Sequence, residues 1–252
     1  MSRKRSKKKD QSTDLVEALV RNGHAIAEGP KRKTWTKHDI KTIKPLTTSQ
    51  EDMFHAFFAG KNVCAHGTAG TGKTYIALYL ALNEMTRAEA NIKKIIIVRS
   101  AVPTREMGFM PGTLEEKMAL YETPYVDMFA DLLRRRNSYR DMKDAGLVEF
   151  CVTSYIRGLT WDDAVVVVDE TQNMTFHEIN SIMTRLGQNS RIIMVGDTAQ
   201  SDLKGKRVEQ TGMDRLLEVA NRMESFDVVH FTKHDIVRGD VVKSWIVACE
   251  EA

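Results

Sequence analysis

The chain has 252 residues, of which 42% are hydrophobic and 28% are charged, so its composition excludes fibrous and disordered proteins and favours a globular domain. No apolar run approaches the roughly 18 residues that a membrane-spanning helix needs, and the N-terminus lacks the apolar core of a signal peptide. We therefore expect no membrane segment and a cytoplasmic location. The formal net charge is +3, and the first nine residues alone hold six bases, so the rest of the chain is net negative.

Residues 1–44 show no sustained hydrophobic periodicity and contain basic clusters at residues 3–9 and 31–33. We interpret them as a basic, disordered N-terminal extension, and residues 45–252 as one folded domain. The basic block either binds polyanions by counterion release or acts as a solubilising terminus. The first predicted helix begins near Thr48, because Thr48 or Ser49 can cap the helical apolar pattern that follows.

Beyond this helix, short apolar runs alternate with helical patterns. The predicted strands cover residues 62–65, 95–98, 148–152, 165–168, 192–195 and 226–231, and the predicted helices cover 75–85, 176–186 and 213–223. Apolar strands separated by helices indicate a mostly parallel sheet covered on both faces. The sequence therefore predicts the α/β class, as a three-layer sandwich.

A longer excursion, residues 103–145, separates the second and third predicted strands. Its final part is helix-like and base-rich around Arg134, Arg135 and Arg136, and a connection of this size is more often functional than idle. Outside it, the three cysteines lack CxxC spacing, so we expect reduced core residues. His230 and His234 have helical spacing but no acidic or sulfur companions, which argues against a metal site built from side chains alone.

The strongest motif runs from residue 67 to residue 74, between a predicted strand and a predicted helix, and fits GxxxxGK[ST]. Such a loop turns backbone N–H groups onto phosphate oxygens, while its lysine reaches the β- and γ-phosphates and its hydroxyl coordinates Mg²⁺. The sequence therefore predicts a P-loop that binds ATP with Mg²⁺. The residues expected at the nucleotide are Gly67, Thr68, Ala69, Gly70, Thr71, Gly72, Lys73 and Thr74, with Lys73 also catalytic and Thr74 also a metal ligand.

Two further strands end in polar residues at the sheet edge where ligands bind in such folds. Asp169 and Glu170 follow a valine run, and beside a P-loop we expect Asp169 to hold Mg²⁺ and Glu170 to act as the base that orients the attacking water. Gln200 follows the next strand and fits a sensor of the γ-phosphate or the water. A plain strand end is the alternative reading of both segments.

The chain resembles the PhoH-like ATPases, a family of bacteria and their phages with phosphate-starvation associations. The residues that carry the resemblance lie at 67–74, 99–102, 108–112, 154–158, 168–173, 183–187, 196–203 and 235–238. It covers residue 45 to the end. The chain departs from the family pattern at Gly239-Asp240, where His-Pro is usual, and it shows no fused nuclease domain, so we expect no ribonuclease activity.

The resemblance implies a domain similar to the first motor domain of superfamily 1 helicases. It places Gln50 where such proteins read adenine; the alternative is an ordinary surface helix residue. It also suggests a homohexamer. Arg238 then fits an arginine finger, which stabilises charge on the γ-phosphate. Because the residues after Gln200 are too few for a second motor domain, we expect the finger to reach a neighbouring subunit's site across a ring; an ordinary surface salt bridge is the alternative.

Two functions follow from these motifs. In the first, ATP hydrolysis by the ring moves, unwinds or remodels RNA or single-stranded DNA, bound through basic residues of the tail, the Arg134–Arg136 cluster, Arg157, Lys204, Lys206 and Arg207. In the second, ATP occupancy switches a regulatory or assembly module, and hydrolysis only resets it. The sequence does not choose between them.

Overall fold

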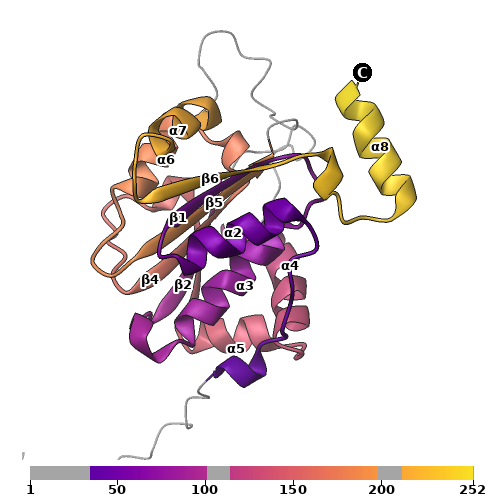
Figure 1. Ribbon diagram of the computed structural model, residues 1–252. Helices are drawn as coiled ribbons and strands as arrows, with labels where there is room; N and C mark the ends of the chain where they lie inside the picture. Colours follow the sequence, from indigo (N-terminus) through magenta and orange to yellow (C-terminus); the bar gives the residue numbers. More distant parts are fainter. Residues whose placement is uncertain (1–34, 101–113, 198–211, 252) are drawn as a thin grey trace, which may run out of the picture. The chain divides into compact units, whose positions relative to one another are not determined.

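The computed structural model describes residues 35–100, 114–197 and 212–251, in which six strands form one sheet (Figure 1). The strand order is β3-β2-β4-β5-β1-β6, and every pairing among these strands is parallel. The strands are β1 (Asn62–Gly67), β2 (Lys94–Arg99), β3 (Val148–Val152), β4 (Ala164–Asp169), β5 (Arg191–Asp197) and β6 (Phe226–Phe231). All six predicted strands and the mostly parallel sheet are confirmed.

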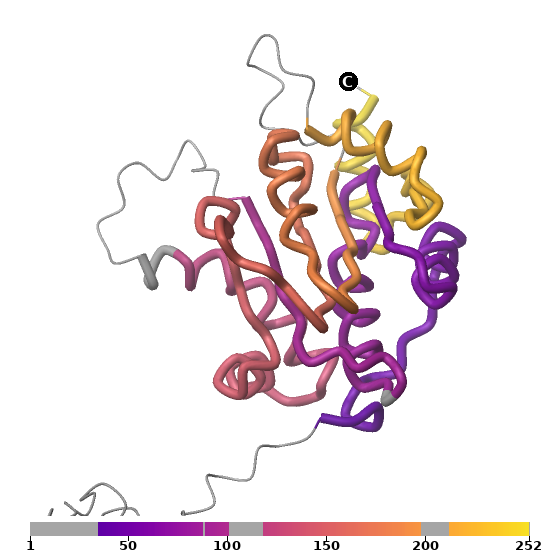
Figure 2. Tube along the Cα trace, turned by 90° about the vertical axis from the view of Figure 1, so that its left-hand side faces the viewer, coloured from indigo at the N-terminus to yellow at the C-terminus, as the bar shows by residue number. Residues whose placement is uncertain are grey.

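Helices cover both faces of this sheet, which confirms the three-layer α/β architecture (Figures 1 and 2). One apolar cluster joins the sheet to α2 (Thr48–Phe58), α3 (Lys73–Met85), α4 (Leu114–Leu132) and α5 (Ser138–Asp144). The other joins it to α6 (Phe176–Met183) and α7 (Gly212–Ala220). The 3-10 turns are η1 (Lys37–Asp39), η2 (Ala88–Ala90), η3 (Thr153–Tyr155), η4 (Thr171–Asn173) and η5 (Lys233–Asp235), and the helix α8 (Asp240–Glu251) has no buried residue.

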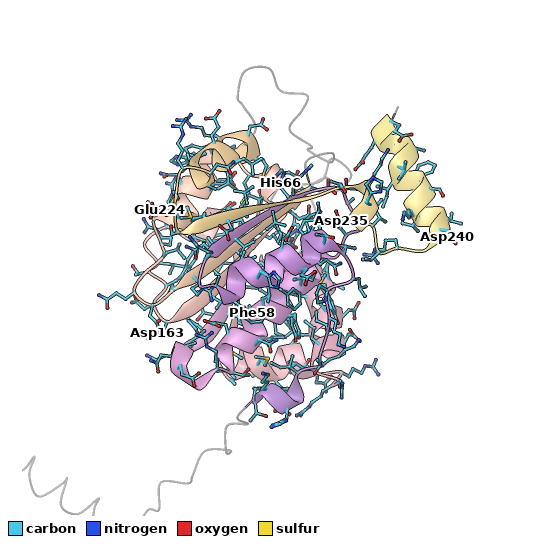
Figure 3. The ribbon with its side chains drawn as sticks, in the orientation of Figure 1. Phe58, His66, Asp163, Glu224, Asp235 and Asp240 are labelled. Carbon is cyan, nitrogen blue, oxygen red and sulfur yellow. The ribbon has the colours of Figure 1, made fainter. Side chains whose placement is uncertain are left out.

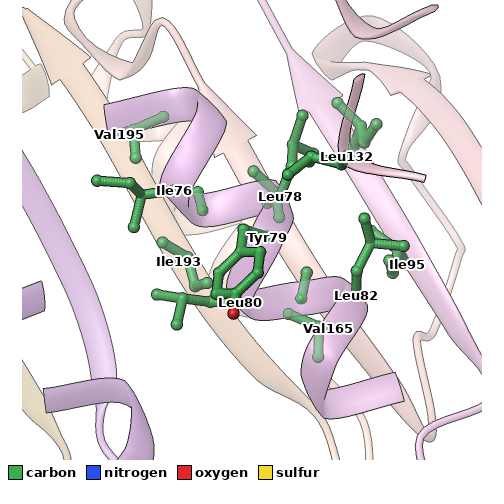
Figure 4. Packing of buried hydrophobic residues seen from close by; sticks show 14 of the residues in the cluster. Ile76, Leu78, Tyr79, Leu80, Leu82, Ile95, Leu132, Val165, Ile193 and Val195 are labelled. Atoms are coloured by element: carbon green, nitrogen blue, oxygen red, sulfur yellow. The ribbon is translucent and has the colours of Figure 1, made fainter. Parts of the chain in front are cut away.

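The valine run of β4 shows why the strands read as continuous apolar stretches. Val165 and Val167 belong to the cluster on the α3 face, whereas Val166 and Val168 belong to the cluster on the α6 face. Figure 4 shows Leu78 and its neighbours on α3 packed against β2, β4 and β5. Because burying each such side chain contributes about 1.5–3 kcal/mol, α3 is held firmly against the strands that carry the polar residues at the sheet edge.

The carboxyl ends of all six strands lie at one edge of the sheet, because the strands are parallel. Figure 3 shows His66 near the carboxyl end of β1, whereas Asp163 and Glu224, which precede β4 and β6, lie toward the opposite edge of the sheet. His66 stacks on His230 of β6, with ring centroids 4.8 Å apart. Because His230 lies in β6 and His234 in η5, the two histidines do not share a helical turn.

Several sequence expectations differ from the structure at the edges of the domain. Ile40, assigned to the extension, is buried in the core, and the Lys41 N–H donates to the Leu132 carbonyl oxygen at 2.7 Å. The packed chain thus includes residues before 45, whereas residues 1–34 lie outside the described part. The cap of α2 is Thr47, one residue before the expected position, because its hydroxyl accepts from the Gln50 N–H.

The structure around Arg134–Arg136, in the excursion between β2 and β3, also differs from the prediction of a helix-like stretch. The Arg134–Arg136 cluster lies in the turn between α4 and α5, and the backbone of Arg134 has a positive φ of 51°, which ends the helix. The three cysteines are free as expected, but Cys249 on α8 is exposed and does not belong to the core. Among the described helices, none combines the length and apolar character needed to cross a membrane.

Candidate active site

The predicted P-loop connects the carboxyl end of β1 to the N-terminus of α3. Gly67 has a φ of +125°, and a Cβ there would lie 1.9 Å from the Phe231 carbonyl oxygen. The Thr68 N–H donates to this same oxygen at 2.9 Å. Glycine is therefore required at position 67 both by its backbone angle and by the close approach of β6.

Lys73 is the first residue of α3, and its side chain folds back over the loop. Its Nζ atom donates to the Thr68 carbonyl oxygen at 2.6 Å and to Thr71 Oγ1 at 3.2 Å. Burial lowers the pKa of this ammonium group, while the negative charges of Asp197 and Glu170 oppose the shift. The side chain thus carries its donors into the loop at a helix N-terminus, where anions are favoured.

Asp169 and Thr74 meet at the carboxyl end of β4, as the sequence predicted for the metal ligands. The Thr74 hydroxyl donates to Asp169 Oδ1 at 2.9 Å. The second carboxylate oxygen, Oδ2, accepts a hydrogen bond of 2.8 Å from the hydroxyl of Tyr125 on α4. Burial, and then the charge of Asp169, raise the pKa of Tyr125 well above its usual value, so this phenol is a neutral donor.

Glu170 adopts a left-handed backbone conformation, with a φ of 54°, which is uncommon for a residue with a side chain. Its Oε2 atom accepts from Gln172 Nε2 at 2.6 Å, and its Oε1 atom lies 3.7 Å from Arg99 Nη2. Burial and the neighbouring Asp169 raise the pKa of Glu170, against the opposing charge of Arg99. A carboxylate with a raised pKa accepts a proton more readily, as a general base must.

Gln172 links Glu170 to the end of β5. Its side chain is buried, and its Oε1 atom accepts from the Asp197 N–H at 2.9 Å while its Nε2 atom donates to Glu170. Local sequence pattern predicts no role for Gln172, although it lies two residues after the predicted base. Gln200, the predicted sensor, lies in the segment 198–211, outside the described residues.

Gln50 is buried beside the loop, and both ends of its amide are engaged. Its Nε2 atom donates to the Thr71 carbonyl oxygen at 2.9 Å, and its Oε1 atom accepts from the Leu46 N–H at 2.7 Å. It therefore ties the P-loop to the residues that precede α2. The amide has a second N–H and a second lone pair besides those used in these two bonds, and the adenine-reading role stays a prediction.

Arg238 lies beside the P-loop of its own chain. The Val237 N–H donates to the Gly70 carbonyl oxygen at 3.1 Å, and a Cβ on Gly70 would lie 3.1 Å from the Cγ atom of Arg238. Arg238 therefore lines the pocket of its own chain, and the expected role as a finger that reaches a neighbouring subunit stays a prediction. The backbone hydrogen bond holds the segment after η5 against the loop and brings the guanidinium to the same site.

A single pocket at the sheet edge gathers most of the predicted site residues. Gln50, Gly67 and Thr68 are not among its lining residues; Gln50 donates to the loop at the Thr71 carbonyl oxygen, and the Thr68 carbonyl oxygen accepts from Lys73. The residues that line it are Ala69, Gly70, Thr71, Gly72, Lys73, Thr74, Tyr75, Met128, Asp169, Glu170, Gln172, Val195, Gly196, Asp197 and Arg238. Residues from four distant parts of the chain thus converge on the loop.

Comparison with known proteins agrees with this geometry. A family model described as PhoH-like protein matches residues 42–250. The chain belongs to the PhoH-like protein family. It is 35% identical over 213 residues to a PhoH-like protein of Bacillus subtilis (strain 168), and this match covers 84% of the chain and 65% of the relative.

A PhoH-like protein of Mycobacterium bovis is 34% identical over 209 residues, which are 82% of the chain and 58% of that relative. The chain thus spans about three fifths of the length of the PhoH-like relatives it matches. Among solved structures, the Hef helicase domain of Pyrococcus furiosus is similar at 14% sequence identity and a TM-score of 0.43. The alignment covers 73% of this chain and 37% of the Hef chain. A likeness of that degree carries no argument about this chain.

The oxygen atoms at the sheet edge fit the Mg²⁺ ion that a P-loop core of the PhoH-like family implies. Mg²⁺ prefers oxygen ligands and is usually held by one or two carboxylates together with substrate phosphates. Thr74 Oγ1 and Asp169 Oδ1 lie 2.9 Å apart at the pocket, and they supply one hydroxyl and one carboxylate. Lys73 and Arg238 add positive charge for phosphates at the same place.

Proposed function

We propose that this chain binds ATP with Mg²⁺ and hydrolyses it. The observation that carries the proposal is the hydrogen bond between Thr74 Oγ1 and Asp169 Oδ1, because it joins the P-loop to the carboxyl end of β4. These two segments are 95 residues apart in sequence, and a phosphate loop by itself would serve binding alone. Their junction, with Glu170 beside it, provides the parts that hydrolysis needs.

Each residue has a distinct task in this reaction. Lys73 binds the β- and γ-phosphates, while Thr74 and Asp169 hold Mg²⁺, which neutralises phosphate charge when it is bound. Glu170 orients the attacking water and accepts its proton. Arg238 stabilises the charge on the γ-phosphate from within the same chain, since it lines the same pocket as Lys73.

Two substitutions test the assignment. Lys73→Ala is expected to abolish tight ATP binding, because it removes the charge that pairs with the phosphates. Glu170→Gln is expected to bind ATP normally but to hydrolyse it at least about a hundredfold more slowly, since an amide cannot accept the proton. Nucleotide binding is measured by fluorescence titration and turnover by phosphate release.

Two exposed residues provide matched controls for these substitutions. Lys93→Ala and Glu218→Gln make the same chemical changes at ion pairs outside the pocket, with Asp163 and Arg215 respectively. Both variants should behave as the wild type. Undiminished affinity in Lys73→Ala, or near-normal turnover in Glu170→Gln, would remove the residue from its proposed role.

We further propose that hydrolysis is coupled to binding and remodelling of RNA or single-stranded DNA in a homohexameric ring, which the resemblance to helicase-like ATPases supports. The ATPase rate is measured with and without single-stranded RNA and DNA, and the assembled mass is measured by light scattering with and without ATP. Strong stimulation supports the motor. Indifference to both polymers would favour the ATP-driven switch, and a monomer with full ATPase activity would contradict the ring. Cytoplasmic location stays a prediction.

A further inference from the structure

Tyr125 is a buried residue of α4 whose hydroxyl reaches the proposed metal ligand. It has no exposed surface, and its hydroxyl donates to Asp169 Oδ2 at 2.8 Å. The two residues are 44 positions apart. Because Thr74 donates to the other oxygen of the same carboxylate, each oxygen of Asp169 is bonded to a different element.

The helix that carries Tyr125 is anchored at three points. The Tyr125 ring packs against the Phe150 ring of β3, with centroids 5.8 Å apart. Glu122, one turn earlier, accepts a hydrogen bond of 2.8 Å from the Tyr139 hydroxyl of α5. Near the end of α4, Asp131 pairs with Lys41 at 3.0 Å. The phenol is therefore held in place by packing that does not depend on Asp169.

A carboxylate that accepts fixed donors at both oxygens cannot rotate freely about its terminal bond. A rigid orientation matters for Mg²⁺, which demands near-ideal geometry from its ligands. Groups that hydrogen-bond a metal ligand from behind typically change metal affinity by 10- to 100-fold when they are removed. When a cation engages the Oδ1 side, beside Thr74, the Tyr125 bond to Oδ2 can persist.

We propose that Tyr125 is a positioning residue for the divalent cation: its hydroxyl holds the Asp169 carboxylate in the orientation that binds Mg²⁺. The excursion after β2 thereby contributes a part of the metal site. This inference rests on the proposed function, because it concerns the cation that accompanies the nucleotide. The competing interpretation is that Asp169 merely satisfies a buried phenol and that the bond contributes only to folding.

The test is the Tyr125→Phe variant, which keeps the ring and its packing and removes only the hydroxyl. ATP binding is titrated by fluorescence at increasing Mg²⁺, and again in EDTA. We expect the Mg²⁺ concentration for half-maximal tightening of ATP binding to rise about tenfold or more, while the affinity in EDTA stays unchanged. Combining Tyr125→Phe with Asp169→Ala should add no further shift, since the hydroxyl acts through that carboxylate.

Tyr139→Phe is the matched control, because it removes another buried phenol that donates to a carboxylate, Glu122, outside the pocket, and so weakens the anchoring of α4 without removing the bond to Asp169. Thermal unfolding of both variants measures the contribution to folding. A Mg²⁺ dependence like that of the wild type in Tyr125→Phe, or an equal shift in Tyr139→Phe, would overturn the positioning role. If the wild-type chain binds no ATP at any Mg²⁺ concentration, the proposed function itself fails, and the two failures are thereby distinguished.

Discussion

Asp169 and Glu170 are consecutive carboxylates whose side chains lie in different surroundings. Asp169 accepts from Thr74 and Tyr125, whereas Glu170 accepts from Gln172 and lies near Arg99. The left-handed backbone of Glu170 accompanies this divergence. A sparsely populated conformation held at such a place is typical of functional sites, and here it separates the metal ligand from the proposed base.

The environment of Glu170 leads to a prediction about pH. Because burial and Asp169 raise the pKa of Glu170, the acid limb of the turnover profile should lie above the usual range of a glutamate. Arg99 opposes this rise, so Arg99→Ala should raise the pKa further. A base with a higher pKa is deprotonated only at higher pH, and the acid limb of kcat should therefore move upward. The measurement is kcat at saturating ATP across the pH range.

The control for this pH experiment is Arg215→Ala, which removes an exposed arginine paired with Glu218 and should leave the profile in place. The Arg99 pair lies at 3.7 Å and its two side chains are partly exposed, so only a modest displacement is expected. A shift of the acid limb toward lower pH in Arg99→Ala would contradict the electrostatic assignment.

The P-loop and the two carboxylates were predictable because each motif consists of residues that are contiguous in the sequence. Tyr125 was not, since it meets Asp169 across 44 positions of sequence and no spacing rule relates them. Gln172 lies close to Glu170 in the chain, but its second partner is the backbone of Asp197, 25 positions away. Hydrogen bonds that join distant segments depend on the folded sheet, and local pattern does not reveal them.

At the scale of elements, the segment after β6 is fixed both to α2 and to the P-loop. In η5, Asp235 Oδ2 accepts from the Thr232 N–H at 2.8 Å and from the Ser49 hydroxyl at 3.0 Å. Two residues later, Val237 bonds to Gly70. This arrangement explains why Arg238 lines the pocket of its own chain.

The position of Arg238 predicts the outcome of a subunit-mixing experiment. Arg238→Ala should lower turnover by about 10³-fold, the lower end for arginine fingers, and spare ATP affinity. Mixing it with Glu170→Gln subunits should restore nothing, because a finger that serves its own chain cannot complete a neighbour's site. Phosphate release by the mixture is compared with that of each variant alone, with Arg222→Ala as an exposed control. Activity that returns only in mixtures would show that the finger acts between subunits.

The strands were predicted closely, whereas three of the described helices, α4, α5 and α8, were not. Each strand is a short apolar run, and the central strands β1, β2, β4 and β5 are buried almost throughout, so their pattern stands out without knowledge of their partners. In α4, Pro124 interrupts the helical pattern of the sequence, so this helix was assigned to an irregular excursion. The one-sided helical pattern of α8, which includes Val241 and Trp245, is present in the sequence, but both side chains are exposed in the structure.

For the whole molecule, the three cysteines lie at different depths and can report on opening of the fold. Cys64 in β1 is fully buried, Cys151 in β3 is partly buried and Cys249 in α8 is exposed. Burial raises the pKa of Cys64 to about 12 and that of Cys151 to about 11. Since the thiolate is the reactive form, both thiols are protected chemically as well as sterically.

A thiol reagent under native conditions should therefore modify Cys249 first and Cys64 last. Modification of Cys64 requires opening of the sheet, and ATP with Mg²⁺ at 100 times its Kd should slow it about 100-fold, because a ligand of the folded state makes opening rarer. Mass spectrometry of digested samples gives the rate at each cysteine. Modification of all three at similar rates would contradict the predicted order, and a Cys64 rate that ignores ATP would argue against binding at the P-loop.

The sheet order also determines when β1 can pair with its neighbouring strands during synthesis of the chain. In the described sheet, β1 pairs with β5 and β6, so that Val63 lies beside Ile193 and Asp227. At a synthesis rate of 5–20 residues per second, the ribosome adds β5 on the order of ten seconds after β1. The strands β2, β3 and β4 can pair with one another in the interval. A nascent chain thus carries its P-loop strand with both edges open to pairing with other chains until β5 and β6 emerge.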